Sequence, residues 1–189
     1  MKKILCVLLL LLTGCSSKTS MIEIQKHVYV EKEFKDSWLE TNEFGDSYIK
    51  EELQGGYHYH FDQQFLEIFF NTGGKIELYN YSIKKNDLII SGEMIPPKTI
   101  RLVHPHLDNV TSEGVIIHEL GHYFDEKHQF SSSKQFTKLY KKYRTLFNQK
   151  TKKEYFAECF KEYVGGHQEK VKPFHSYMKT ITQKIRKKK

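Results

Sequence analysis

Apolar and polar positions between residues 61 and 105 follow first a helical and then an alternating pattern. The glycines after the helical pattern are expected to end a helix near residue 72. The segment KIELYNY at residues 75–81 alternates as a strand, and residues 86–105 predict two further short strands around a proline-containing turn. Residues 22–54 have no clear period and receive no assignment. Four residues make up the apolar face of the helix: Phe61, Phe65, Ile68 and Phe69.

The chain from residue 109 onward has a helical pattern. Residues 110–128 predict one helix, with Thr111 or Ser112 as its cap. Because strands precede helices, with no repeat and no linker rich in proline or glycine, we expect a single α+β domain over residues 22–189. Three further helices are expected: an amphipathic one at residues 132–147, one from Thr151 to Gly165–Gly166, and a basic one after Pro173.

The N-terminus, MKKILCVLLLLLTGC, has the features of a secretory signal. Two lysines precede an apolar run that is too short to span a bilayer. The sequence LTGC resembles the bacterial lipobox, which implies removal of residues 1–14 and lipidation of Cys15. A short tether would follow over residues 15–21. An ordinary signal peptide with an incidental cysteine is the alternative.

The charge of the chain bears on its binding partners, and its cysteine content bears on whether a disulfide can form. The formal charge of +7 falls to +5 once Lys2 and Lys3 leave with the signal, and the C-terminal KTITQKIRKKK alone carries six positive charges. A basic tail beside an anchored domain favours anionic lipid or wall polymer over nucleic acid, and a solvated helix end explains it equally well. Cys159 is the cysteine left over, so no disulfide is expected within the chain, and we expect its thiol to be buried.

The segment VIIHELGHYFDEKH at residues 115–128 carries the strongest chemical signal. His118 and His122 are four residues apart, so on a helix both imidazoles can reach a single ion. Glu119 would then lie beside the metal as a general base rather than as a ligand. A pair of partly buried histidines without a metal is the alternative interpretation.

Two residues compete to be the third protein ligand. His128 has the spacing of the third histidine in metzincins, but that motif has a glycine where this chain has Asp125. An aspartate adopts the sharp exit from the helix less readily.

The rival is Glu154, the first residue of an acidic stripe on the helix that follows. Glu154, Glu158 and Glu162 recur at i, i+4 and i+8, and Ala157 between them would let another helix approach closely. In this arrangement Glu154 is a ligand and Glu158 accepts a hydrogen bond from a ligand imidazole. A solvated acidic face paired with nearby lysines is the alternative, and for Glu162 it is the preferred interpretation.

Both segments together resemble the zinc peptidases related to the catalytic domain of anthrax lethal factor, a family that includes the secreted Pro-Pro endopeptidases. The family's H-E-x-G-H helix, with an aspartate three residues on, is matched by His118, Glu119, Gly121, His122 and Asp125. Its E-x-F-A-E-x-F segment is matched by Glu154, Phe156, Ala157, Glu158 and Phe160. The resemblance covers residues 61–164 and implies a zincin-like fold, with a small mixed sheet before the active-site helix.

The resemblance also implies the site. One Zn²⁺ would be held by His118, His122 and Glu154, with Glu119 as the catalytic base, and His128 would be a surface residue. The family places a tyrosine seven residues before the glutamate ligand, where its hydroxyl assists the tetrahedral intermediate. This chain has Phe147 there, and Tyr143 is the candidate substitute. The phenylalanine at this position is expected to affect the catalytic rate more than metal binding.

These features predict a zinc endopeptidase, expected as a monomer that acts on secreted or surface proteins. The anchor at Cys15 would hold it on the extracytoplasmic side of the cell membrane of a Gram-positive bacterium. The strand KIELYNY is a candidate edge for pairing with an extended peptide. A cytosolic regulator-cleaving peptidase also often carries H-E-L-G-H, but the lipobox disfavours it. A non-catalytic zinc-binding surface lipoprotein, which binds a protein or wall partner, is the alternative of a different class.

Overall fold

The structure of the chain is a computed structural model that describes residues 20–41, 45–85, 88–104, 113–149 and 151–187. The predicted signal peptide, Cys15, most of the tether and the candidate helix caps at residues 111–112 lie outside the described residues.

The described chain has a mixed α+β fold, as predicted. Its strands are β1 (Met21–Gln25), β2 (Val28–Glu31), β3 (Lys75–Tyr79), β4 (Ile83–Lys85), β5 (Leu88–Ile90), β6 (Gly92–Ile95) and β7 (Thr99–Val103). Its α-helices are α1 (Lys35–Leu39), α2 (Tyr48–Gln54), α3 (Gln64–Asn71), α4 (Val115–His128), α5 (Lys134–Tyr143), α6 (Lys152–Val164) and α7 (His175–Arg186). Three short 3-10 helices are η1 (Lys32–Phe34), η2 (Phe130–Ser132) and η3 (Gln168–Phe174).

Five strands form one mixed sheet in the order β1-β2-β3-β7-β6, and β4 and β5 form a separate hairpin. The three central strands are parallel, whereas β1 and β6 run antiparallel to their neighbours. Side chains on one face line up across the parallel strands in two buried layers, because parallel register places equivalent positions side by side. The layers are Val28, Ile76 and Ile100, and Val30, Leu78 and Leu102.

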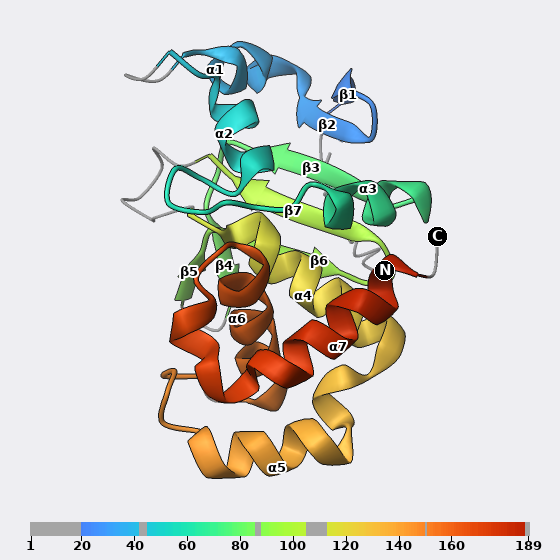
Figure 1. The fold of residues 1–189 in the computed structure, drawn as a ribbon. Helices are drawn as coiled ribbons and strands as arrows, with labels where there is room; N and C mark the ends of the chain where they lie inside the picture. The colour runs from blue at the N-terminus through green and yellow to red at the C-terminus, as the bar shows by residue number, and fades with distance from the viewer. Residues whose placement is uncertain (1–19, 42–44, 86–87, 105–112, 150, 188–189) are drawn as a thin grey trace, which may run out of the picture.

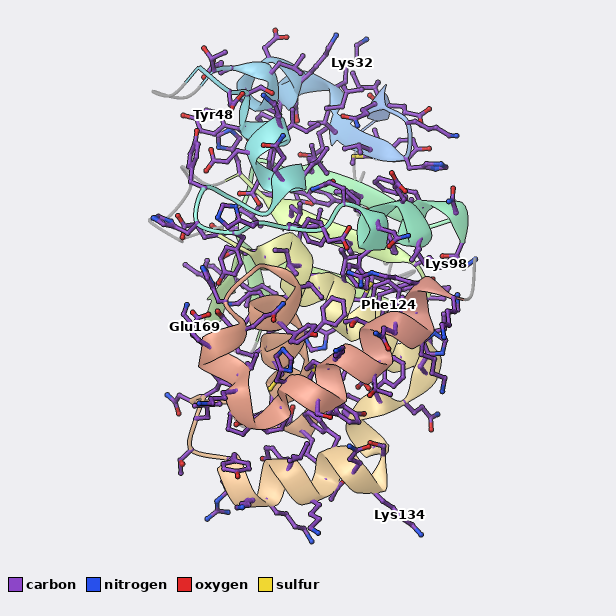
Figure 2. All side chains as sticks on the ribbon, viewed as in Figure 1. Lys32, Tyr48, Lys98, Phe124, Lys134 and Glu169 are labelled. Carbon is purple, nitrogen blue, oxygen red and sulfur yellow. The ribbon has the colours of Figure 1, made fainter. Side chains whose placement is uncertain are left out.

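The C-terminal helices pack in successive layers on one side of this sheet (Figure 1). α4 lies against β6 and β7, α6 and α7 pack beyond α4, and α5 lies at the end farthest from the sheet. Side chains from all these layers join one hydrophobic cluster, so the chain from β1 to α7 shares one core. Figure 2 shows how densely side chains fill the space between the layers, with Phe124 of α4 near the middle.

The predicted helices on both sides of the strands are confirmed, with shifts at their ends. α3 begins at Gln64, so Phe61 precedes the helix although its side chain still packs into the core. α5 ends at Tyr143 rather than at residue 147. β1 begins at Met21, one residue before the predicted boundary of the domain. Cys159 is fully buried as predicted, and burial raises the pKa of its thiol.

The prediction that KIELYNY is a sheet edge was wrong. β3 lies between β2 and β7, so both of its sides are already paired. The edge beside the helices is β6, which pairs with β7 on one side only. Alternation along the strand shows that it is half-buried but not which neighbours it pairs with, because pairing is set by the whole sheet.

α4 and α6 approach each other closely at Gly121 and Ala157. A β-carbon on Gly121 would lie 2.9 Å from the Ala157 α-carbon, closer than such atoms can stand. The predicted role of Ala157 in allowing a close approach is therefore confirmed, and Gly121 is the partner that makes it possible.

Replacing Gly121 with valine should force the two helices apart. We expect the free energy of unfolding to fall by about 1–3 kcal/mol, the usual cost of overpacking a core. Lys127→Ala, an exposed change on the same helix, should stay within about 0.5 kcal/mol of the original protein. Chemical denaturation measures both, and equal stability of the two variants would contradict the close contact.

Candidate metal centre

α4 supplies the two histidines on one face. Gly114, with φ 72°, takes the left-handed conformation just before the helix, and its carbonyl accepts the hydrogen bond of the His118 backbone N–H at 2.9 Å. Because His118 and His122 are one turn apart, their rings meet edge to face, with centroids 4.9 Å apart.

α6 supplies the carboxylate from its first turn. The Thr151 side chain caps this helix by accepting a hydrogen bond from the Glu154 backbone N–H at 3.2 Å. A carboxylate in the first turn also interacts favourably with the positive end of the helix dipole. The cap therefore fixes the start of α6 and directs the Glu154 side chain towards α4.

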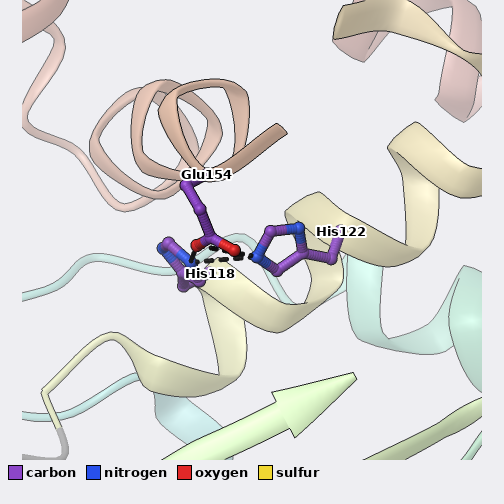
Figure 3. A group of neighbouring side chains, drawn as sticks. All are labelled: His118, His122 and Glu154. Atoms are coloured by element: carbon purple, nitrogen blue, oxygen red, sulfur yellow. Dashed lines mark hydrogen bonds and ion pairs between the residues drawn. The ribbon is translucent and has the colours of Figure 1, made fainter. Parts of the chain in front are cut away.

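His118, His122 and Glu154 converge on one point between the two helices (Figure 3). The Nε2 atoms of the two histidines are 3.2 Å apart, and each lies 3.2 Å from Oε2 of Glu154. Tetrahedral zinc, with ligands at about 2.0–2.1 Å, would place its ligand atoms about 3.3 Å apart. The three atoms thus fit a tetrahedral dication, and no other such group occurs in the searched, described part of the chain.

Glu158 orients the first of these histidines. Its Oε2 lies 3.2 Å from Nδ1 of His118, so an Nδ1–H that donates to this carboxylate leaves Nε2 facing the group. The predicted position of Glu158 behind a ligand imidazole agrees with this contact. Burial opposes ionisation of Glu158, but hydrogen bonds from His118 and Lys161 hold the pKa of its carboxyl below the ordinary value.

The hydrogen bonds among these residues also shift the pKa values of His118 and Glu154. Burial opposes the charged form of His118, yet hydrogen bonds to Glu154 and Glu158 raise its pKa to about 9. Hydrogen bonds from both histidines lower the pKa of Glu154. A proton on Nε2 of His118 and a metal ion would compete for the same position, so metal binding requires the deprotonated nitrogen.

Glu119 is buried on the sheet side of α4 and is not among the three converging residues. The backbone N–H of Met94 on β6 donates to its carboxylate. Burial raises the pKa of Glu119 above its ordinary value, against the opposing effect of the nearby histidines. A carboxyl group with a raised pKa beside a metal site suits a group that gains and loses a proton.

The converging residues open onto two cavities. One is about 700 Å³ and is lined by parts of β6, α4 and the segment that leads into α6. The other is about 340 Å³ and extends towards Glu113 and Lys161. Both share Ile90, Gly92, His118 and Glu119 in their walls, so space for a ligand lies on either side of the histidines, along β6.

His128 and Asp125 have other roles. His128 is the last residue of α4, its ring packs 5.1 Å from that of Phe130, and it is not part of the converging group. Asp125 is buried and accepts hydrogen bonds from the Ser131 backbone N–H and hydroxyl, each at 2.6 Å. This aspartate therefore fixes the turn after α4.

Neither Phe147, at the position of the family tyrosine, nor Tyr143, its candidate substitute, lines either of these two cavities. The Phe147 ring packs 5.3 Å from that of Tyr155, and the Tyr143 ring lies 6.1 Å from that of Phe174. α5 ends at Tyr143, so residues 143 and 147 do not share a helical face. The residues that do line the larger cavity here are Asn148 and Gln149, which the sequence did not single out.

The interpretation of Glu162 as a solvated residue paired with lysines was wrong about its exposure, whereas the pairing with lysines is confirmed. Glu162 is only 4 % exposed and accepts hydrogen bonds from Tyr59 and His167, each at 3.0 Å. Lys170 also lies 3.1 Å from its carboxylate. Its partners come from two segments outside α6, so the helical spacing alone gave no sign of them.

Lys161 joins the buried carboxylates of α6 to one another. Its ammonium lies 2.7 Å from Glu158 and 3.7 Å from Glu162. A continuous polar chain therefore runs from His118 through Glu158 and Lys161 to Glu162.

No protein-family model matches the chain, and no curated protein matches it. Among the residues that the structure describes, no helix has both the length and the apolar character needed to cross a bilayer.

Replacing a predicted metal ligand should weaken zinc binding far more than replacing a nearby residue. We expect Glu154→Ala to abolish tight zinc binding and His128→Ala to leave it unchanged, because Glu154 belongs to the converging group and His128 does not. Glu158→Ala should lower the affinity by about 10–100-fold, as for other residues that orient a ligand. Competition with a chromogenic chelator measures all three. Loss of metal in His128→Ala but not in Glu154→Ala would contradict the geometry.

Proposed function

We propose that the protein is a zinc-dependent endopeptidase. The observation that carries the proposal is the set of three ligand atoms at tetrahedral spacing, with the buried carboxyl of Glu119 alongside and ligand space on either side. Two imidazoles and one carboxylate form a typical catalytic zinc set, which leaves one coordination position for water or substrate. The resemblance of both motifs to the lethal factor-related peptidases supports the same metal and a zincin-like identity for the fold.

The chemistry is peptide hydrolysis. Zinc bound here would polarise the scissile carbonyl and lower the pKa of water to near neutrality. Glu119 accepts the proton of the water that attacks the carbonyl carbon and then delivers it to the leaving nitrogen as the C–N bond breaks. Its buried position and the Met94 N–H hold this carboxyl in place for both transfers.

An extended peptide fits along β6. Val103 donates to Ser91 across the β6–β7 pair at 2.8 Å, so alternation turns the backbone groups of Gly92 and Met94 away from β7. The Met94 N–H already binds Glu119, and the remaining outward groups are placed to pair with a substrate backbone. The two cavities would then hold side chains on either side of the scissile bond.

The amide side chains of Asn148 and Gln149 take the place of the missing tyrosine in this proposal. An amide N–H can donate to a developing oxyanion as a phenol does. Both residues line the larger cavity, whereas Tyr143 and Phe147 do not.

The cellular context is also a proposal. Lipidation at Cys15 would hold the enzyme at the extracytoplasmic face of the membrane, where secreted or surface proteins are its substrates. A non-catalytic zinc lipoprotein is the competing function, and the phenylalanine at position 147 is the observation that favours it.

The variant Glu119→Gln distinguishes a peptidase from a non-catalytic zinc-binding protein. The change keeps the size of the side chain but removes the base, so zinc content and melting temperature should stay close to the original. Cleavage of a peptide library should fall by roughly 10²–10⁴, the usual contribution of a positioned general base. If the original protein, loaded with zinc, cleaves no peptide and both forms bind the same partner, the peptidase is rejected.

A second set of variants locates the oxyanion donor. The double change Asn148→Ala and Gln149→Ala should lower kcat by about 10²–10³ without loss of zinc. Tyr143→Phe should leave kcat unchanged, because its ring packs on Phe174. A large loss in Tyr143→Phe with an active double variant would assign the role to the tyrosine instead.

A further inference from the structure

α5 has one buried and one basic face. Phe136 is fully buried, and Leu139, Tyr140 and Tyr143 pack against the core. The opposite face carries four exposed lysines at i, i+4, i+7 and i+8, which form a stripe along the helix. We call this surface the basic stripe, and its residues are Lys134, Lys138, Lys141 and Lys142.

The charge of this region is of one sign and is not neutralised within the fold. Residues 131–151 contain six lysines and arginines and no acidic residue. None of the ion pairs found in the described part of the chain includes a residue of α5. Such a stripe attracts an extended anionic surface, because each lysine keeps its full charge for an external partner.

An exposed leucine lies directly after the stripe. Leu146 is 42 % exposed, two residues beyond Arg144, and is one of few large apolar side chains in the described chain that are open to solvent. Lysines beside an apolar side chain suit the boundary of an anionic bilayer, where charge meets headgroups and the leucine meets acyl chains. A nucleic acid or an acidic soluble polymer would use the lysines but leave the leucine in water.

We propose that the basic stripe and Leu146 dock on the surface of an anionic lipid membrane. The segment that follows, through Asn148 and Gln149, lines the larger cavity beside the metal centre. Docking of α5 therefore brings the mouth of this cavity near the membrane surface. The proposal stands on the charge and exposure of α5 and does not depend on peptidase activity.

Vesicle binding tests the proposal with a chain that starts at Ser16, which retains every described element but lacks the predicted anchor. The probes are vesicles of phosphatidylcholine with phosphatidylglycerol, and vesicles of phosphatidylcholine alone. We expect binding to the first only, weakening as salt rises. The triple variant Lys134→Glu, Lys138→Glu, Lys141→Glu should bind at least about 100-fold more weakly, because each lysine lost near an anionic surface costs about fivefold and each new glutamate is repelled.

A matched triple variant controls for net charge and folding. Lys26→Glu, Lys32→Glu and Lys35→Glu change the charge equally among exposed residues at the other end of the molecule, where Figure 2 shows Lys32 opposite Lys134. This variant should bind vesicles nearly as the original does. Both triple variants should keep zinc affinity and melting temperature, which separates lost docking from lost folding.

Leu146→Ser and a soluble competitor distinguish the membrane from other polyanions. The leucine change should weaken vesicle binding without altering charge, and polyphosphate should compete only at high concentration. Equal losses in the two triple variants, absence of binding to the anionic vesicles, or tight polyphosphate binding that Leu146→Ser leaves intact would each overturn the proposal.

Discussion

Two glycine contacts hold α4 between its neighbours, and the metal centre depends on both. At Gly121 the helix touches α6 so closely that a β-carbon would lie 2.9 Å from the Ala157 α-carbon. At Gly92 the edge strand β6 touches Val115 in the first turn of α4, where a β-carbon would lie 2.6 Å from the valine side chain. The first contact brings Glu154 within reach of the histidines, because a glutamate side chain spans only a few bonds. The second brings the Met94 N–H onto Glu119. The converging residues and the Glu119 carboxyl are thus placed by backbone proximity.

The acidic stripe of α6 is stable inside the protein because every carboxylate faces basic side chains, some of which are shared between two carboxylates. Glu162 is matched by Lys161 and Lys170, and Glu158 by Lys161 and His118. Glu154 has His118 and His122, and it is the most exposed of the three. A buried charge costs several kcal/mol unless it is paired, and a dication held by His118, His122 and Glu154 would complete this pattern.

The sequence predicted those features that depend on spacing along one element. His118 and His122 share a face by helical periodicity, and Thr151 and the Gly165–Gly166 pair mark the ends of α6. Features set by distant segments were missed. The order of the strands is decided by pairing across the sheet, so nothing in KIELYNY marks it as central. Glu162 is buried by Tyr59 and His167, which lie outside its helix. The elements between β1 and α2 are each at most seven residues long, so each shows only a short stretch of pattern.

The two walls of the larger cavity are held with unequal strength. β6 is fixed by its backbone pairing with β7 and by the contact of Gly92 with α4. The opposite wall, at Asn148 and Gln149, lies outside any helix or strand, and the nearby ion pair of Lys153 with Glu126 is exposed at 3.5 Å. Exposed pairs contribute at most about 1 kcal/mol. In the arrangement that we propose, β6 therefore fixes the substrate backbone, whereas the second wall adjusts to its side chains. Since that wall continues directly from α5, a surface that holds α5 also restrains the part of the cleft that selects the substrate.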